Sequence, residues 1–195
     1  MGQQNSGHPE YGHTAGVDAS TGPLGHGFAM GVGFAVAEAM LAAKYNKPEF
    51  TVIDHYTYGL TSDGDLMEGV ASEAASLAGT LGLGKLIYLY DDNKITIEGS
   101  TDIAFTEDVE ARFKAYGWQV LRVADSEDIE AMEAAVKEAQ ADTEHPSLII
   151  VRTHIGYGSP KQDSASCHGE PFGAEALALT KEKPAGLLVN RSMCL

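Results

Sequence analysis

The sequence predicts an α/β protein built on a doubly wound, mostly parallel sheet. Two near-continuous apolar runs, KLIYLY at 85–90 and SLIIVRT at 147–153, are typical of strands that helices cover on both faces. Segments with helical periodicity alternate with such strands, and right-handed crossovers then place helices on both sides of the sheet. The 195 residues, of which 44% are apolar, suffice for one domain with a substantial core.

The first residues are predicted to form a loop and then a long helix. Residues 1–25 are rich in glycine and show no clear hydrophobic period, as is usual for a loop. Residues 27–45 read as a helix that is apolar on most sides and therefore buried. Gly31 and Gly33 weaken this helix, which indicates a close-packing reason for both. Short β-prone runs follow at 50–54 and 56–61.

A second helix is expected over residues 66–81, stopped by Gly82. The segment Gly79–Lys85 matches the phosphate-loop pattern G-x-x-x-x-G-K. The next residue is Leu86, so no hydroxyl is present for Mg²⁺, and the segment joins a helix to a strand, the reverse of the required order. It is interpreted as a helix end and a tight turn. The predicted inward stripe of this helix is Met67, Val70, Ala74, Leu77, Ala78 and Leu81.

The second half of the chain repeats the alternation of helices and strands. Thr106–Asp108 opens a helix that Gly117 closes, and Ser126 is expected to cap the next one. That later helix is predicted to turn Ile129, Met132, Ala135 and Val136 inward. The expected elements are a short strand at 95–97, a helix at 106–116, a strand at 118–124, a helix at 126–141, a strand at 147–153 and a Gly/Ser-rich loop at 156–173.

Loops at the carboxyl ends of the predicted strands are the expected binding region. In open parallel sheets, ligands bind outside these ends. A fourth loop leads into the amino end of the first helix, so all four are expected to converge on one crevice. The loops are 62–65, 91–95, 155–168 and 22–27.

Asp63 and Asn93 are the candidate metal ligands. A hard cation such as Mg²⁺ or Ca²⁺ prefers carboxylate, amide and carbonyl oxygens, and Gly64 would let the backbone approach a phosphate. The alternative is that these loops are ordinary polar turns, because Asp, Asn and Gly are common turn residues. The glycine-rich Gly22–Gly27 before a helix likewise fits an anion site or a plain turn.

Histidines and one glutamate complete the candidate residues. The seven histidines lack the spacing of a zinc site. His8 and His168 lie in glycine-rich loops, where a functional role is plausible. Glu68 follows the Asp63 loop by about one turn, so it either lies on a solvated helix face or faces a partner or cofactor.

Composition excludes several classes of function. The formal charge of −15 argues against nucleic acid, whose binding requires Lys and Arg against phosphates. No window reaches about 18 continuous apolar residues, and the start MGQQNSGHPE lacks the features of a signal peptide, so no membrane association is expected. With only Cys167 and Cys194, a disulfide scaffold is excluded and a cytoplasmic location is predicted.

Taken together, these stretches resemble transketolase over about residues 7–180. The matching pieces are GHPE (7–10), TGPLGHG (21–27), DHYTY (54–58), SDGDLMEG (62–69), SEAASLAG (72–79), LYDDNKITIEG (89–99), FTEDVEARFKAYGW (105–118), IGYGSP (155–160) and CHG (167–169). The resemblance implies the diphosphate-binding domain of the thiamine diphosphate fold. That family moves a two-carbon ketol unit between sugar phosphates, in the pentose phosphate pathway.

The resemblance also implies roles for individual residues. Asp63, Asn93 and the Ile95 carbonyl would bind Mg²⁺ or Ca²⁺. Glu68 would belong to a carboxylate network that links the two active sites of the family's homodimer, and His8 would lie beside the thiazolium and the sugar, with His168 as the second catalytic histidine. The residues expected to contact thiamine diphosphate are Gly22, Leu24, Gly64, Asn93, Ile155 and His168.

Departures from the family pattern limit the expected activity. Residues 1–181 are predicted to be a partial diphosphate-binding domain, incomplete at its amino end, and 182–195 a divergent tail. Ser62 replaces a usual Gly, His26 a usual Gln, and Lys161–Cys167 departs from the usual loop with its Thr-His pair. Without the pyrimidine-binding domain and its activating glutamate, the chain alone is expected to be inactive. The alternatives are one subunit of a split transketolase that needs a pyrimidine-domain partner chain, a non-catalytic fragment, or a generic nucleotide-binding α/β protein.

Overall fold

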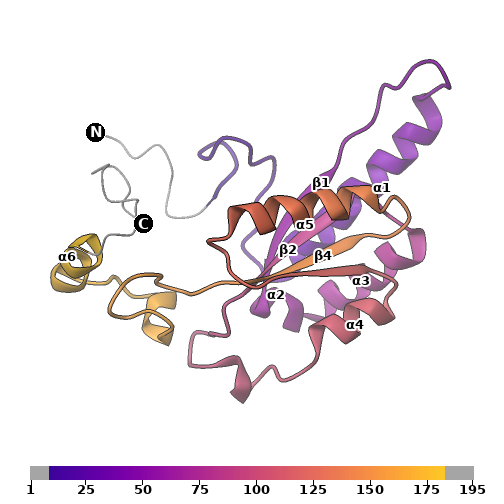
Figure 1. Ribbon diagram of the computed structural model, residues 1–195. Helices are drawn as coiled ribbons and strands as arrows, with labels where there is room; N and C mark the ends of the chain where they lie inside the picture. Colours follow the sequence, from indigo (N-terminus) through magenta and orange to yellow (C-terminus); the bar gives the residue numbers. More distant parts are fainter. Residues whose placement is uncertain (1–8, 183–195) are drawn as a thin grey trace.

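The computed structural model describes residues 9–182 and contains one sheet of four parallel strands in the order β1-β2-β4-β3 (Figure 1). The α/β fold with a parallel sheet is therefore confirmed. The strands are β1 (Thr57–Ser62), β2 (Leu86–Asp92), β3 (Gln119–Val123) and β4 (Ser147–Arg152). The helices are α1 (His26–Tyr45), α2 (Asp63–Met67), α3 (Gly69–Leu81), α4 (Val109–Ala115), α5 (Ile129–Ala141) and α6 (Ala174–Glu182), with short 3-10 turns at Thr101–Ile103 and Ala165–His168.

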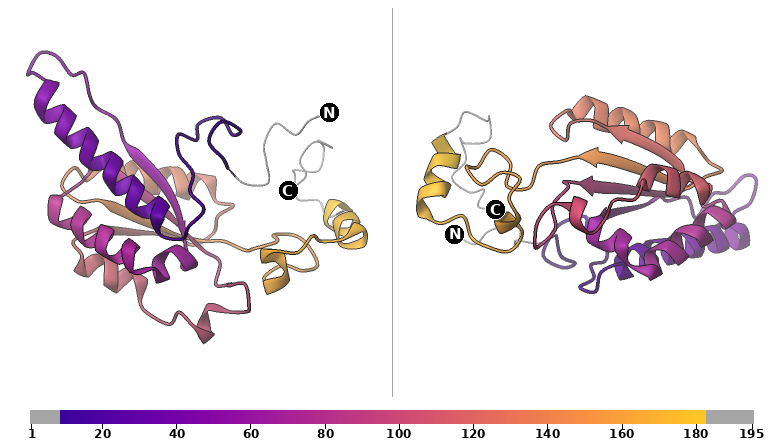
Figure 2. Two further views of the ribbon diagram at one scale, coloured as in Figure 1. Left: turned by 180° about the vertical axis from the view of Figure 1, so that it is seen from behind. Right: turned by 90° about the horizontal axis from the view of Figure 1, so that it is seen from below.

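Helices cover both faces of the sheet, as the right-hand view of Figure 2 shows. On one face, α5 packs through Ala135 and Ala139 against strand residues such as Ile149. The other face holds α1, α3 and α4 over a larger apolar cluster. An aromatic group lies at its centre, with Phe28 stacked on Tyr88 at 4.3 Å between ring centroids. This double covering explains why β2 and β4 are apolar at almost every position.

Two short strands expected from β-propensity do not form. Residues 50–54 are a loop with a single bridge between Lys47 and Phe50, and 95–97 has only a bridge from Ile95 to Ser100. The side chain of Asn46 accounts for the first difference. Its Oδ1 accepts hydrogen bonds from the backbone N–H groups of Val52 and Ile53, at 2.8 and 2.9 Å, so these groups have no need of a strand partner.

The helix predicted over 66–81 is broken at Glu68, which has an extended backbone (φ −77°, ψ 136°) and separates α2 from α3. Arg112 supports the break because its Nη2 donates to the Leu66 carbonyl at 3.1 Å. The predicted end at Gly82 is confirmed, with a left-handed φ of 61°. The interpretation of Gly79–Lys85 as a helix end and turn is therefore also confirmed.

The large apolar residues of the predicted inward stripe are exposed, so the prediction is wrong except at Ala78, which is buried, and Ala74, which is partly buried against the core. Buried instead are Ala71, Ala75 and Ala78, whose small side chains let α3 approach its neighbours closely. Trp118 Nε1 donates to the Ala75 carbonyl at 2.8 Å, which requires that close approach. The exposed positions are Met67, Val70, Leu77 and Leu81.

In α5 the expected inward position of Ile129 is wrong, because that side chain is exposed. Ala135 is buried, and Met132 and Val136 are partly buried against the same cluster, as expected. Asp128 rather than Ser126 caps this helix, since its Oδ1 accepts from Ala131 N at 2.9 Å.

By length and composition α1 is apolar enough to cross a membrane, which corrects the expectation that no such segment exists in the described part of the chain. The prediction that this helix is buried because it is apolar on most sides is wrong, since only one stripe of α1, which includes Phe28 and Val32, is buried, while Phe34 and Met40 are exposed. The buried stripe packs on the sheet, where Tyr88 Oη donates to the Phe28 carbonyl at 2.8 Å. Composition alone therefore does not separate α1 from a membrane span.

Lys85→Met is expected to lower the free energy of unfolding by about 2 kcal/mol, because it leaves the buried Glu38 carboxylate without a cation. Lys85 Nζ lies 2.7 Å from Glu38 Oε1. The loss stays below the roughly 3–5 kcal/mol of a fully buried pair, since Lys85 is partly exposed to solvent. Urea unfolding followed by circular dichroism measures the change.

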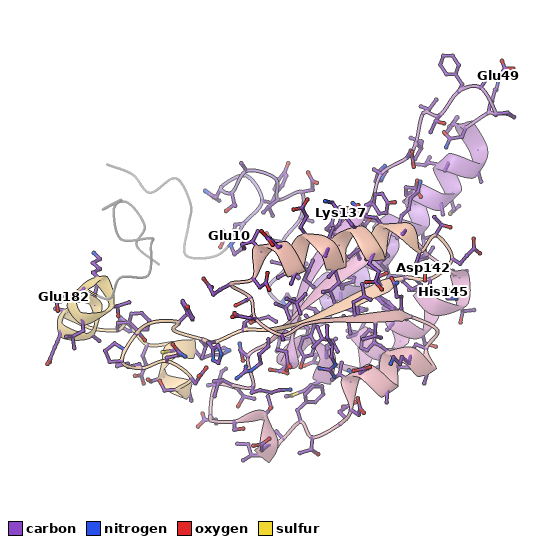
Figure 3. All side chains as sticks on the ribbon, viewed as in Figure 1. Glu10, Glu49, Lys137, Asp142, His145 and Glu182 are labelled. Atoms are coloured by element: carbon purple, nitrogen blue, oxygen red, sulfur yellow. The ribbon has the colours of Figure 1, made fainter. Side chains whose placement is uncertain are left out.

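Lys137→Met is the matched control for Lys85→Met. Lys137 pairs with Glu133 on the exposed face of α5 (Figure 3). Such pairs contribute little, so a change within about 0.5 kcal/mol is expected. Equal losses in both variants would contradict the role assigned to Glu38.

Candidate functional site

The carboxyl ends of three strands lie level with one another. Ser62 of β1 pairs in register with Asp91 of β2, and Asp91 with Val151 of β4. The loops that follow these strands leave the sheet at one end, from which residues 153–182 continue outward (Figures 1 and 2). The predicted loops 62–65 and 91–95 thus meet at one edge, where ligands bind in sheets of this type.

Asp65 joins the glycine-rich loop to the Asp63 loop. Its Oδ1 accepts from Gly25 N at 2.8 Å, and its Oδ2 accepts from both the backbone N and the Oγ of Ser62 at 3.1 Å. Asp65 is not among the site residues that the sequence predicts. The available local signal was an S-x-x-D pattern before a helix, but the contact with Gly25, forty positions away, has no local signature.

Asp63 is a buried carboxylate at the start of α2, only 4% exposed. The Tyr90 hydroxyl donates to its Oδ1 and so orients it. Burial raises the pKa of Asp63 above its ordinary value, the Tyr90 hydrogen bond opposes this, and the nearby Asp92 carboxylate adds to it. Burial, together with Asp63, also raises the pKa of Tyr90, so the phenol stays a donor. A buried acid with too little compensating charge is suited to a cation.

Asn93 and Ile95 lie on a tight turn after β2. Asn93 Oδ1 accepts from Ile95 N at 2.8 Å, and its Nδ2 donates to Asp91 Oδ2 at 3.0 Å. Lys94, between them, has a left-handed φ of 66°, and its Nζ lies 2.6 Å from Asp92 Oδ1. The Thr153 hydroxyl donates to Asp91, which ties this turn to the end of β4.

The oxygens at this edge fit a hard divalent cation. Asp63 supplies a carboxylate, Asn93 a side-chain amide and Ile95 a backbone carbonyl, which is the ligand chemistry that Mg²⁺ and Ca²⁺ prefer. The net charge of this edge is negative, because three carboxylates, those of Asp63, Asp91 and Asp92, lie beside the ammonium group of Lys94. Within residues 9–182 no cluster of three or more His, Cys, Asp or Glu is arranged to hold a metal, so a site built on acids and histidines alone is not the type found here.

The amino end of α1 fits an anion. Its N-cap is Gly25, at φ 76°, with no side-chain cap of its own, and its first turn contains no acidic residue. The Gly25 N–H is bonded to Asp65 Oδ1, so the remaining N–H groups of the first turn and the helix dipole are what this end offers an anion. Leu24 lies over Gly64, where an added Cβ would be 3.3 Å from Leu24 Cδ1. Around Gly22 an added Cβ would meet nothing within 4 Å. Leu24 and Gly64 thus lie together at this edge, and Gly22 leaves open space in the loop before α1.

Glu68 lies at the junction of α2 and α3 with an exposed side chain. An added Cβ on Gly25 would be 2.8 Å from Glu68 Cβ, so the glycine-rich loop packs directly on this junction. The helix break therefore presents the Glu68 carboxylate to solvent at the rim of the site, where a partner can reach it.

Ile155 and His168 belong to the segment between β4 and α6. This segment leaves the sheet beyond the end of β4 (Figure 1). An added Cβ on Gly156, which has a left-handed φ of 64°, would be 2.5 Å from Cys167 Sγ, so the turn that carries His168 packs on the residue after Ile155. Among the described residues, no hydrogen bond or ion pair joins 155–168 to the Asp63 or Asn93 loop. The structure thus brings the neighbours of Ile155 and His168 into contact but does not bond this loop to Asp63. His8 lies outside the described residues, as do residues 183–195 of the predicted tail.

The family model described as "Transketolase, thiamine diphosphate binding domain" matches residues 1–189. Transketolase from Streptococcus pyogenes is 56% identical over 181 residues, which cover 93% of this chain and 25% of the relative. Transketolase from Geobacillus stearothermophilus is 58% identical over 182 residues, covering 93% and 27%.

Solved transketolase structures share the fold. A Pichia stipitis transketolase in complex with sedoheptulose-7-phosphate matches with a TM-score of 0.85 and 51% identity, covering 89% of this chain and 26% of that one. Transketolase from Leishmania mexicana gives 0.85 and 48%, covering 92% and 27%. The chain spans about a quarter of the length of these relatives. Together with the parallel sheet, these matches show that the chain belongs to the transketolase family and corresponds to the thiamine diphosphate-binding domain of that family.

Proposed function

We propose that this chain binds thiamine diphosphate together with Mg²⁺ or Ca²⁺ and forms the diphosphate half of a transketolase active site. In this proposal Asp63, Asn93 and the Ile95 carbonyl hold the metal. The observation that carries it is the buried Asp63 carboxylate, whose pKa burial raises, in the same loop as Asp65, which bonds to the amino end of α1. A cation beside Asp63 and a diphosphate at the amino end of α1 would neutralise each other's charge.

The remaining candidate residues would place the rest of the cofactor. Gly22, Leu24 and Gly64 would face the diphosphate, with Leu24 adding apolar contact. Ile155 and His168 would contact the cofactor from the loop after β4, His8 would act beside the reacting carbon and the sugar, and Tyr90 would keep Asp63 oriented. Glu68, exposed at the rim, would extend toward the second active site of a dimer.

The reaction of the assembled enzyme would be transfer of a two-carbon ketol unit between sugar phosphates. When bound, thiamine diphosphate supplies the carbon nucleophile for breaking and forming the carbon–carbon bond beside a carbonyl. Support comes from the related Pichia stipitis transketolase, which has been crystallised with sedoheptulose-7-phosphate. We propose that activity needs a homodimer or a partner chain that carries a pyrimidine-binding domain. The chain alone is therefore expected to be inactive. Its cytoplasmic location stays a prediction.

Calorimetric titration of the full chain with thiamine diphosphate, in Mg²⁺ and then in EDTA, tests this function. Saturable binding is expected in Mg²⁺, with a loss of at least about 100-fold in affinity in EDTA, because two phosphates would then face an acidic edge. Ca²⁺ is expected to restore binding.

The same titration decides between the proposal and its alternatives. A folded chain that binds no cofactor in either metal would be a non-catalytic fragment. Binding without ketol transfer, followed by activity on adding a pyrimidine-domain chain, would identify a split enzyme.

A further inference from the structure

The loop after β4 is closed by a pair of side chains at its base. His154 Nδ1 lies 3.0 and 2.9 Å from the two carboxylate oxygens of Asp163. A carboxylate only accepts hydrogen bonds, so Nδ1 carries the proton and donates. The backbone N–H of Asp163 in turn donates to the Ile155 carbonyl at 2.9 Å. Two adjacent residues at the start of the loop are thus both bonded to Asp163.

Asp163 has a left-handed backbone, with φ 59°, which is unfavourable for a residue with a side chain. The loop inside the pair is held by its own bonds. Ser159 N donates to the Gly156 carbonyl at 3.0 Å, and Gly158 N donates to Gln162 Oε1 at 2.9 Å. Because the bonds of this loop are internal, the His154–Asp163 pair at its base sets how the loop leaves the sheet.

The turn that carries His168 depends on the same arrangement. Cys167 Sγ donates to the Lys161 carbonyl at 3.1 Å and packs on Gly156, while Ser164 N donates to that carbonyl at 3.0 Å. Both contacts come from the segment that Asp163 anchors. If the base opened, Ile155 and His168 would lose their fixed separation.

We propose that His154 and Asp163 are positioning residues, which hold Ile155 and His168 in the arrangement that receives the cofactor. The inference rests on the proposed function, and neither residue of the pair is placed in contact with thiamine diphosphate. Asp163 lies in the segment Lys161–Cys167, where this chain departs from the family's usual loop, so one half of the anchor comes from that departure. Both side chains of the pair are half-exposed, so the pair contributes little to the stability of the whole chain. Its effect is expected to be confined to the loop.

The test uses the full chain and His154→Phe, which keeps a planar ring but removes the donor. His145→Phe is the matched control, because His145 Nδ1 bonds Asp142 at 3.1 Å in a turn at the opposite end of the sheet (Figure 3). Amide hydrogen exchange over residues 155–168 is measured without cofactor. Exchange is expected to become about tenfold faster in His154→Phe and to stay unchanged in His145→Phe, as for loss of one hydrogen bond to a carboxylate.

Thiamine diphosphate affinity in Mg²⁺ is then measured by calorimetry. The dissociation constant is expected to rise about tenfold in His154→Phe, with an unchanged melting temperature of the chain without cofactor, and His154→Gln, which retains an N–H donor, is expected to restore most of the affinity. Unchanged exchange in the loop overturns the inference. So does faster exchange with wild-type affinity, which leaves the proposed function standing. Absence of binding by the unaltered chain instead overturns the proposed function and this cofactor role with it.

Discussion

Asp63→Asn is expected to abolish metal-dependent binding of thiamine diphosphate, with a loss of at least about 100-fold in affinity. The substitution keeps the size of the side chain and an oxygen that accepts from the Tyr90 hydroxyl. It removes the charge that faces the metal, and a neutral amide holds a divalent cation far less well than a carboxylate. Calorimetric titration with thiamine diphosphate in Mg²⁺ measures the loss.

Asp102→Asn is the control for this loss of charge, because Asp102 is exposed in the 3-10 turn Thr101–Ile103 and belongs to no part of the proposed site. It removes the same single charge, and its affinity is expected to stay within about twofold of the unaltered chain. If Asp63→Asn still bound the cofactor with metal dependence, the assignment of Asp63 as a ligand would be wrong.

The same Asp63→Asn substitution is expected to stabilise the chain in EDTA. Burial raises the pKa of Asp63 above its ordinary value of 3.8, so the folded chain holds this proton more tightly than the unfolded chain. The resulting contribution to stability is present at low pH and is lost as the pH rises through the raised pKa. At pH 7 the ionised carboxylate therefore opposes folding, and Asn removes this cost.

Thermal unfolding at two pH values measures that stabilisation. A gain of a few degrees is expected at pH 7, since about 1 kcal/mol corresponds to about 2–4 °C in a chain of this size. Below about pH 4 the gain should vanish, because Asp63 is then protonated in both states. Equal gains at both pH values would show that desolvation of the carboxylate is not the cause.

Gly31→Ala is expected to destabilise the chain by about 2–4 kcal/mol. An added Cβ would overlap the Tyr88 hydroxyl and lie 2.9 Å from Tyr88 Cζ. Tyr88 has no room to move, because its ring is buried and stacked on Phe28 and its hydroxyl donates to the carbonyls of Gly27 and Phe28. Overpacking of this kind costs about 1–3 kcal/mol, and displacing the hydroxyl adds the loss of its hydrogen bonds. Urea unfolding measures the effect.

Gly33→Ala provides the opposite expectation in the same helix. An added Cβ at Gly33 would meet nothing within 4 Å, so the close packing predicted for both glycines is confirmed at Gly31 and wrong at Gly33. Alanine favours a helix interior over glycine by about 1 kcal/mol, and a gain of about that size is expected. Equal losses of stability in both variants would show that contact with Tyr88 is not the cause of the loss in Gly31→Ala.

Local patterns predicted most of the fold because they arise from local causes. The near-continuous apolar runs of β2 and β4 identified strands covered on both faces, and a glycine able to adopt a left-handed φ marked the end of α3 at Gly82. The candidate loops could be placed at one edge because parallel strands necessarily end together. The collinear series of motifs also carried the resemblance to the transketolase family, which the matches then confirmed.

The sequence by itself thus determined the α/β class, the strands 85–90, 118–124 and 147–153, and the candidate site at their carboxyl ends. Only the tertiary structure decided which face of α3 is buried, because close approach to Trp118 favours Ala75 over larger apolar residues and helical period alone does not rank two apolar faces. It also decided the bond of Asp65 to Gly25 and the His154–Asp163 pair. Gly25 and Asp65 are forty positions apart and His154 and Asp163 nine, and the chain-closure geometry that brings each pair together has no counterpart in a local sequence pattern.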